Sequence, residues 1–362
     1  MALDIVRQRL HNQFLSHPDF TEPSQVVETL GAVQSQDYSG GKWALGLRMN
    51  GATDAAIDQA FNEGKILRTH ILRPTWHFVA PQDIRWMLKL TAPRVHAVNG
   101  FRYRQLGLDR ETIQKSYKVL ENVLQGNKHL TRTELGSALE KTGIKNAKEG
   151  RLGYLIISAE LDGIICSGAR RGKQFTYALL EERAPNVKSL EKDEALAELT
   201  RRYFVTRGPA TLHDFTWWSG LTMVDAKEGI EAVKSKLACE TIDSHTYWFA
   251  NAATAKKPSA SVSVHLLPNY DEYMVGYTNR TLIFNAAHTG QLDSRRNILF
   301  QYAITINGLA AGTWRRTIKK NEVAIKLSPF TALTDDQNQA LIAATGQYGK
   351  FLELPVVLEQ CV

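Results

Sequence analysis

The chain has 362 residues, 43% hydrophobic and 22% charged, and its 44 lysines and arginines exceed its 37 aspartates and glutamates, giving a net charge of +7. This composition is ordinary for a globular protein of one to three domains with a core of normal size. No apolar run reaches the ~18 residues that span a bilayer, and the amphipathic first residues lack the apolar stretch of a signal peptide. The sequence therefore predicts a cytoplasmic protein with no membrane partner.

The cysteines Cys166, Cys239 and Cys361 are few and far apart in the sequence. This spacing argues against a disulfide framework and against a cysteine-based zinc site. No zinc-protease, phosphate-loop or dinucleotide-binding motif stands in a supporting context. The sequence therefore predicts neither a metal nor any other cofactor.

The mild positive charge suits a nucleic-acid partner, although many proteins reach such a charge without binding one. Each basic cluster alone is more readily a solvated face than a phosphate contact. The clusters are Arg102/Arg104, Arg170/Arg171/Lys173, Arg201/Arg202/Arg207, Arg295/Arg296 and Arg315/Arg316/Lys319/Lys320.

Residues 1–107 are expected to form a first unit that ends in a connecting helix. Hydrophobic periodicity predicts helices over 2–15, 24–36 and 54–63. Residues 65–79, KILRTHILRPTWHFV, have the pattern of a hairpin in which Pro74 confines the strand pair to an edge or a turn.

Residues 108–185 carry the clearest pattern. Helices are predicted over 109–125, 129–143 and 147–161. Thr131 and Glu134 form a capping-box pattern at the start of the second helix, and Gly143 stands where that helix should stop. Residues 163–179 then predict two strands around a Gly-rich basic turn. Three helices followed by a hairpin is the order of a winged helix.

The tip of this predicted hairpin would be the wing. Arg170, Arg171 and Lys173 lie there, and their charge suits contact with phosphate or the minor groove. The alternative, a solvated hairpin tip, is equally open.

Residues 186–250 repeat the order. Helices are predicted over 192–206, 212–219 and 221–237, with Thr211 as a cap, and residues 239–250 are strand-like. In residues 251–362 the pattern changes, with a polar linker at Thr254–Ala260, β-rich segments and a final helix over 334–346. The predicted fold is mainly α with β (α+β): three tandem winged-helix units followed by a small C-terminal β-barrel-like domain.

Gln34, Ser35, Gln36 and Asp37 follow one another near the predicted end of the second helix, before Gly40-Gly41, a predicted flexible turn. Carboxamides there can hydrogen-bond a water or a sugar without carrying charge. From spacing alone, two glutamines that cap a helix end, with Asp37 opening a turn, explain the segment more simply.

Four stretches add a resemblance. They are AVQSQD, LRTHILRPTWHFVAPQDIRWML, LLPNYDEYMVGYTNR and NGLAAGTWRR. With them the chain resembles the winged-helix DNA glycosylases of the AlkZ/YcaQ type, which excise alkylpurines and unhook interstrand crosslinks. The resemblance implies three winged helices with a C-terminal β-barrel, and a catalytic pair of glutamines around a usually hydrophobic residue. Gln34 and Gln36 match that pair, and Ser35 departs from its centre.

The chemistry is consistent with glutamine as the catalytic residue. An N3- or N7-alkylated purine is already cationic, so its departure needs no general acid, and the transition state is oxocarbenium-like. Two neutral carboxamides can orient the attacking water and stabilise charge on the sugar. The sequence thus predicts a monofunctional, monomeric glycosylase that acts on damaged double-stranded DNA through Gln34 and Gln36.

Other residues leave alternatives open. His70 and His77 in the first hairpin could touch DNA, although structural histidines explain them more simply. Asp271 and Glu272 would point to opposite faces of a strand, and are interpreted as structural partners of Arg280. Two rival functions remain: a non-enzymatic DNA-binding regulator, which would usually dimerise, and a protein-interaction array, since tandem winged helices also serve protein contacts.

Overall fold

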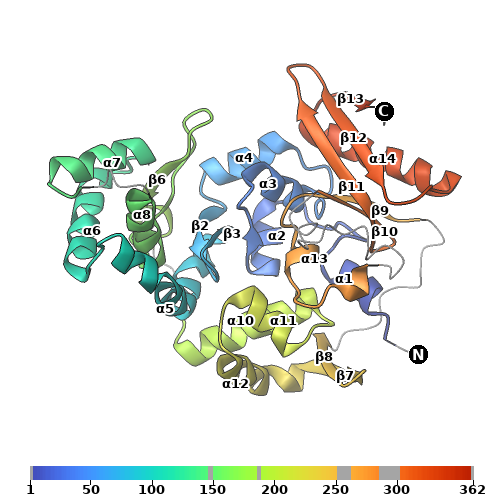
Figure 1. Ribbon diagram of the computed structural model, residues 1–362, viewed down its shortest axis with the longest axis horizontal. Helices are drawn as coiled ribbons and strands as arrows, with labels where there is room; N and C mark the ends of the chain where they lie inside the picture. Colours follow the sequence, from blue (N-terminus) through green and yellow to red (C-terminus); the bar gives the residue numbers. More distant parts are fainter. Residues whose placement is uncertain (1–2, 146–149, 186–188, 251–261, 285–301, 360–362) are drawn as a thin grey trace.

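The computed structural model describes residues 3–145, 150–185, 189–250, 262–284 and 302–359. Figure 1 shows the helices α6–α8 at one end, the N-terminal elements in the centre, α10–α12 beside them, and the C-terminal strands at the other end. No helix among the described residues is long and apolar enough to cross a membrane. The predicted linker at 254–260 and the Arg295/Arg296 cluster lie outside the described residues.

The N-terminal elements surround a small sheet of order β1-β3-β2. They are α1 Ile5–Asn12, α2 Pro23–Leu30, β1 Val33–Gln34, α3 Tyr38–Gly46, α4 Asp54–Asn62, β2 Leu67–Ile71 and β3 Thr75–Val79. The helix predicted over 24–36 is too long: it ends at Leu30, because Gly31 adopts a φ of +79°. The chain then becomes strand β1, which pairs antiparallel with β3.

The predicted flexible turn at Gly40-Gly41 is also wrong, because both glycines lie inside α3. Asp37 is the N-cap of that helix and accepts a hydrogen bond from Gly40 N. A Cβ on Gly41 would lie 3.0 Å from both the Ser35 Cβ and the Phe78 ring. Gly41 therefore permits close packing of α3 against β1 and β3.

The connecting helix α5, Pro81–Gln105, leads to the second unit. This unit contains α6 Arg110–Leu124, β4 Leu130–Thr131, α7 Arg132–Lys141, α8 Arg151–Leu161, β5 Ile165–Ser167 and β6 Thr176–Leu179, with the sheet order β4-β6-β5. The predicted capping box of Thr131 and Glu134 is confirmed, and Gly143 has a φ of +82° just after α7. The predicted order of three helices and a hairpin is present.

The next elements repeat that order. They are α9 Leu180–Arg183, α10 Lys192–Arg207, α11 Leu212–Ser219, α12 Met223–Val233, η1 Lys234–Lys236, β7 Leu237–Ile242 and β8 His245–Ala250. Thr211 caps α11, as predicted, in a capping box with Asp214. The third predicted helix is shorter than expected, because Thr222 caps α12 one residue before Met223.

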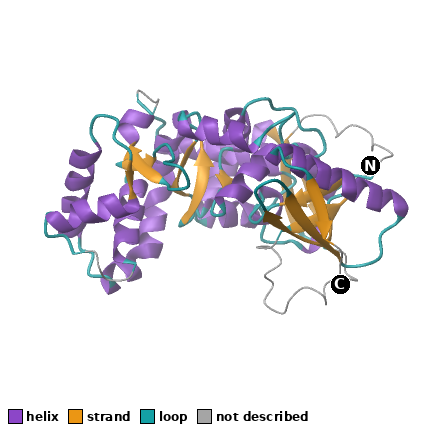
Figure 2. Ribbon diagram, turned by 90° about the horizontal axis from the view of Figure 1, so that it is seen from above, coloured by secondary structure: helices purple, strands orange, loops and turns teal. Residues whose placement is uncertain are grey.

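The C-terminal strands form an open sheet of order β13-β12-β11-β10-β9, so the predicted barrel is not found among the described residues. Their elements are β9 Val264–Leu267, α13 Glu272–Val275, η2 Thr281–Ile283, β10 Ala303–Ile306, β11 Leu309–Ile318, β12 Val323–Pro329, α14 Asp335–Leu352 and β13 Val356–Glu359. The sheet buries its apolar face against α14, which lies along it in Figure 2, and against the N-terminal helices instead of curling onto itself.

One hydrophobic core joins the two ends of the chain. Leu30, Trp43 and Phe78 of the N-terminal unit share it with Trp314 and Tyr348 of the C-terminal segment. The Trp43 indole N–H also donates to the Leu266 carbonyl oxygen at 2.7 Å. The N-terminal unit and the C-terminal sheet therefore depend on each other for burial.

Replacing Trp314 with alanine is expected to lower the free energy of unfolding by about 3–5 kcal/mol, because it empties a fully packed site in this shared core. Hydrogen exchange should show the N-terminal helices and the C-terminal sheet losing protection together. Ile342→Ala on the exposed face of α14 is the control, with a change within about 0.5 kcal/mol. Loss of protection confined to the C-terminal sheet would contradict the shared core.

Candidate active site and DNA interface

Strand β1 and the residues after it place the two predicted glutamines against the β2–β3 hairpin. Gln34 lies opposite His77 of β3, and Ser35 N donates to Trp76 O at 2.8 Å. The Gln34 Oε1 accepts a hydrogen bond from Arg73 Nη2 at 3.1 Å, and the Gln36 Oε1 accepts one from Trp76 N at 3.3 Å. Both carboxamides thus contact one short segment, residues 73–76. Gln34 is 6% exposed, whereas Gln36 is exposed.

Arg68 binds Ser35, the residue between the two glutamines. Its guanidinium donates to the Ser35 carbonyl oxygen through Nε at 3.2 Å and Nη2 at 3.0 Å. It lies over the rings of Trp76 and Phe175, at 4.4 and 4.9 Å from their centroids. Burial lowers the pKa of Arg68 to about 10, so it stays charged at neutral pH.

A buried ion pair lies on the other side of Gln34. Glu272 and Arg207 are both fully buried, with Arg207 Nη2 2.6 Å from Glu272 Oε2. The other carboxylate oxygen, Oε1, accepts a hydrogen bond from Gln34 N at 2.8 Å. Burial alone would raise the pKa of Glu272, but the charge of Arg207 and the hydrogen bonds from Arg207 and Gln34 N hold it below its ordinary value. The site therefore has an ionised carboxylate directly behind a glutamine.

The sequence-based interpretation of Asp271 and Glu272 needs correction. They begin the short helix α13 and not a strand, and neither pairs with Arg280, whose Nε donates to the Met274 carbonyl oxygen at 3.0 Å. Asp271 forms a bidentate pair with Arg48, with both distances 2.9 Å. The partners of the two carboxylates are far away in the sequence, so no local pattern could have identified them.

His70 and His77 are buried in the β2–β3 hairpin, 3% and 0% exposed. His70 Nδ1 lies 2.5 Å from Glu160 Oε2, and His77 Nδ1 lies 3.0 Å from the Thr75 carbonyl oxygen. Burial, with Arg73 nearby, lowers the pKa of His77 to about 3, so this ring is neutral at physiological pH. Neither ring offers surface to a phosphate, so the burial of both argues against the predicted DNA contact.

The three basic residues at the tip of the β5–β6 hairpin have different surroundings. Arg170 is half-buried against α4, where its Nη1 lies 3.3 Å from Asp58 Oδ1 and its guanidinium stacks over the Tyr38 ring at 4.9 Å. Arg171 is exposed and pairs with Glu134 at 2.8 Å, and Lys173 is exposed. Arg170 therefore docks the hairpin onto the N-terminal unit, next to α4 in Figure 1, while Arg171 and Lys173 face solvent.

The β11–β12 hairpin carries a second basic tip. Arg315, Lys319 and Lys320 are exposed there. Arg316 instead turns inward, with its guanidinium over the Tyr302 ring at 4.5 Å and its Nη2 donating to Ser39 Oγ at 2.7 Å. Both basic hairpins project from the same side of the molecule in Figure 1.

Among the described residues Trp217 is the most exposed tryptophan, and Arg73 lies between it and Gln34. Trp217 is 42% exposed, whereas Trp218 and Trp314 are buried in the core. The guanidinium carbons of Arg73 and Arg280 lie 5.6 and 5.2 Å from its ring centroid, and its indole N–H donates to the Val275 carbonyl oxygen at 3.0 Å. No sequence pattern distinguishes this tryptophan from the others, because its exposure depends on how α11 packs against α13.

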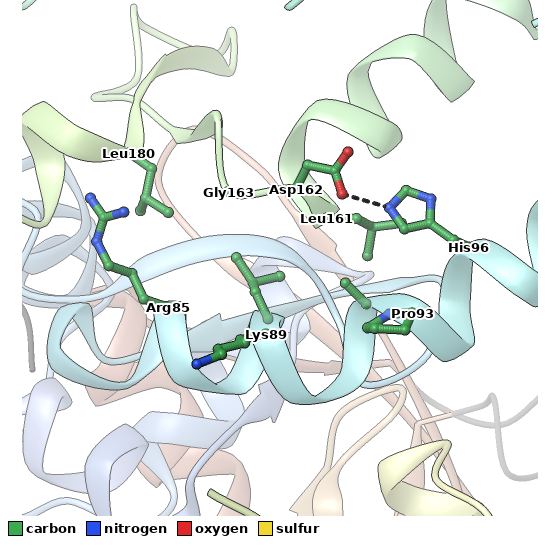
Figure 3. Close-up of a pocket in the computed structure, with 10 residues that line it drawn as sticks. Arg85, Lys89, Pro93, His96, Leu161, Asp162, Gly163 and Leu180 are labelled. Atoms are coloured by element: carbon green, nitrogen blue, oxygen red, sulfur yellow. Dashed lines mark hydrogen bonds and ion pairs between the residues drawn. The ribbon is translucent and has the colours of Figure 1, made fainter. Parts of the chain in front are cut away.

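A hollow of about 370 Å³ between α5 and the end of α8 lies away from the glutamines. Figure 3 shows His96 pointing at Asp162, and Nε2 of His96 lies 2.9 Å from Oδ1. Arg85 and Lys89, which also line the hollow, pair with Glu181 and Glu191. Its basic side chains are thus already matched by carboxylates.

Comparison with known proteins supports the resemblance. The family described as "DNA glycosylase AlkZ-like" matches residues 27–351. The chain is 22% identical over 334 residues to an interstrand DNA cross-link repair glycosylase of Streptomyces sahachiroi, covering 89% of each chain. The solved structure of the Streptomyces sahachiroi DNA glycosylase AlkZ superposes with a TM-score of 0.79 at 21% identity, covering 98% of both chains. Because the family match extends over most of the sequence, this chain belongs to the AlkZ-like family of DNA glycosylases.

Proposed function

We propose that this protein hydrolyses the N-glycosidic bond of alkylated purines, or of purine-linked interstrand crosslinks, in double-stranded DNA. The observation that carries the proposal is the pair of carboxamides of Gln34 and Gln36, held against one segment of the β2–β3 hairpin. The Streptomyces sahachiroi relative is an interstrand DNA cross-link repair glycosylase, which supports the crosslink as a substrate.

The charges around the glutamines favour a cationic leaving base. The ionised Glu272 is fully buried and bonded to Arg207, so it offers no proton to a leaving group. An N3- or N7-alkylated purine needs none, because the base departs as a neutral molecule. Gln34 and Gln36 orient the attacking water and stabilise the oxocarbenium-like sugar through their carboxamide oxygens.

The exposure of Gln36 favours a lesion that is not drawn into a deep pocket. Bulky adducts and crosslinked bases are hard to extrude from the helix. The exposed Gln36 can reach such a base with limited distortion of the duplex. In the free structure the Gln34 Oε1 accepts a hydrogen bond from Arg73 and the Gln36 Oε1 accepts one from Trp76 N, and each oxygen keeps a second lone pair for water or the sugar.

DNA contact is assigned to the two basic hairpin tips. In this proposal the helix groups of residues 1–107, 108–185 and 186–250 act as winged-helix units, and the protein binds DNA as a monomer. Lys173, Arg315 and Lys320 are exposed and suit phosphate contact. Arg171 and Lys319 are also exposed, and phosphate would replace their partners Glu134 and Glu322. Arg170 positions the first hairpin and is not itself a phosphate contact.

The glutamine mechanism is tested by Gln34→Ala and Gln36→Ala. Each is expected to reduce single-turnover release of 7-methylguanine, or unhooking of a crosslinked duplex, by about 10²-fold or more, because each removes a group that acts on the transition state. DNA affinity should stay within about threefold of wild type, since phosphate contacts supply most binding. Gln59→Ala, on the exposed side of α4, is the matched control and should be fully active.

Two outcomes would contradict this proposal. If both glutamine variants excised bases as fast as the wild type, the glutamine mechanism would be wrong, although the protein would still be a glycosylase. If the wild type bound DNA but released no base from methylated and crosslinked duplexes alike, the protein would be a DNA-binding protein without catalysis.

The DNA interface is tested by the double variant Arg171→Ala/Lys173→Ala. If both cations contact phosphate, the slope of log K against log salt should become shallower by about 1.8, and affinity should fall alike for all sequences. The excision rate at saturating DNA should change little. Lys115→Ala, which removes a similarly exposed cation from α6, should leave the slope unchanged. If the double variant and the wild type had equal salt slopes, the DNA would not contact the tip of the β5–β6 hairpin.

A further inference from the structure

We propose that Glu272 is a positioning residue of this active site, which holds Gln34 by its backbone and offsets the positive charge around it. The inference rests on the proposed function, because it concerns how Gln34 is presented to the sugar. It is carried by the contacts along the free edge of β1, by the burial of the Arg207–Glu272 pair, and by the charges that face Gln34.

Strand β1 has two residues and lies at the edge of its sheet, so one side of its backbone has no neighbouring strand. The Arg207–Glu272 pair supplies the missing partners. Arg207 Nη1 donates to Leu30 O at 2.8 Å and Nη2 donates to Ala32 O at 2.9 Å. Gln34 N, the next outward group, donates to Glu272 Oε1 at 2.8 Å. Leu30 ends α2, Ala32 leads into β1, and Gln34 lies in β1, so the pair fixes the path of the backbone from the helix into the strand.

The pair is itself held rigidly. Arg207 is the last residue of α10 and Glu272 the first of α13, and both are fully buried. Glu272 Oε2 accepts hydrogen bonds from Arg207 Nε at 3.1 Å and from the Trp218 indole N–H at 2.9 Å. The Arg207 guanidinium stacks over the Trp218 ring at 4.2 Å. A small displacement of this carboxylate would therefore move the Gln34 backbone with it.

The charge of Glu272 matters as much as its geometry. Two guanidinium groups approach Gln34, that of Arg73 at its side chain and that of Arg207 along the strand edge. Positive charge develops on the sugar in the transition state. A neutral residue at position 272 would leave two cations facing that charge without compensation, in a site where water screens little.

The carboxamide of Glu272→Gln cannot reproduce these contacts. Glu272 Oε1 and Oε2 both act as acceptors, whereas glutamine offers one acceptor and one N–H₂ donor. Whichever way the amide turns, a donor faces either Gln34 N or the Arg207 guanidinium. The variant therefore keeps the size of the side chain while removing both its charge and one positioning bond.

The neighbouring residue offers a matched control. Asp271 is also fully buried and forms a bidentate pair with Arg48. Arg48 bonds to Ala44 O and Gln13 Oε1, so this second pair does not contact β1. Asp271→Asn thus removes the same charge from the same helix start and strands a buried arginine as well, without touching Gln34.

The experiment compares wild type, Glu272→Gln, Glu272→Asp and Asp271→Asn for single-turnover excision from a 7-methylguanine duplex, DNA affinity, melting temperature and amide exchange at Gln34. We expect both neutral variants to melt at lower temperature. Only Glu272→Gln should lose about 10- to 100-fold in excision rate at nearly unchanged affinity, with faster exchange of the Gln34 amide. Glu272→Asp keeps the charge but reaches less far, and should lie in between.

The outcomes separate this inference from the proposed function. The positioning role would be overturned, and the glycosylase proposal left intact, by either of two results with an active wild type. In the first, Glu272→Gln excises as fast as the wild type. In the second, Asp271→Asn loses as much excision rate as Glu272→Gln does. If Glu272→Gln did not fold, Glu272→Asp would provide the test. An excision rate and a Gln34 amide exchange rate equal to those of the wild type in Glu272→Asp would overturn the positioning role. A wild type that excises no base would overturn both proposals together.

Discussion

The geometry around Gln34 depends on one buried ion pair, Arg207 with Glu272. Two charges taken out of water cost several kcal/mol each, and their attraction repays this only when hydrogen bonds satisfy the remaining donors and acceptors. Here the Leu30 and Ala32 carbonyls, Gln34 N and the Trp218 indole do so. The pair therefore ties the end of α10 and the start of α13 to β1, and it fixes how three distant parts of the chain meet.

The same principle acts one residue away. Asp271 with Arg48 joins the start of α13 to α3, and the shared core joins the C-terminal sheet to the N-terminal helices. Packing of the shared core positions the backbone, and of the two ion pairs only Arg207–Glu272 contacts Gln34. An open sheet at the C-terminus suits this arrangement, because its apolar face is covered by the unit that carries the glutamines.

What the sequence could predict was mostly local. The capping box at Thr131, the cap at Thr211 and the order of three helices and a hairpin depend on residues a few positions apart, and they are confirmed. Strand β1 was predicted as a helix end, because a two-residue strand has no periodicity and exists only through pairing with β3. The burial of His70 and His77 and the partners of Glu272 likewise depend on contacts between distant segments. The glutamines themselves were identified through family resemblance, since their spacing alone favoured a helix cap.

The close approach of α3 to β1 has an evolutionary consequence. A Cβ on Gly41 would lie 3.0 Å from the Ser35 Cβ, and Ser35 is fully buried between the two glutamines. Positions 35 and 41 thus divide a single small volume between them. A lineage that acquires a bulkier residue between its glutamines must first gain room against α3, while any side chain at 41 pushes the reactive strand outward. The side chains that positions 35 and 41 can hold are therefore coupled through the space between α3 and β1.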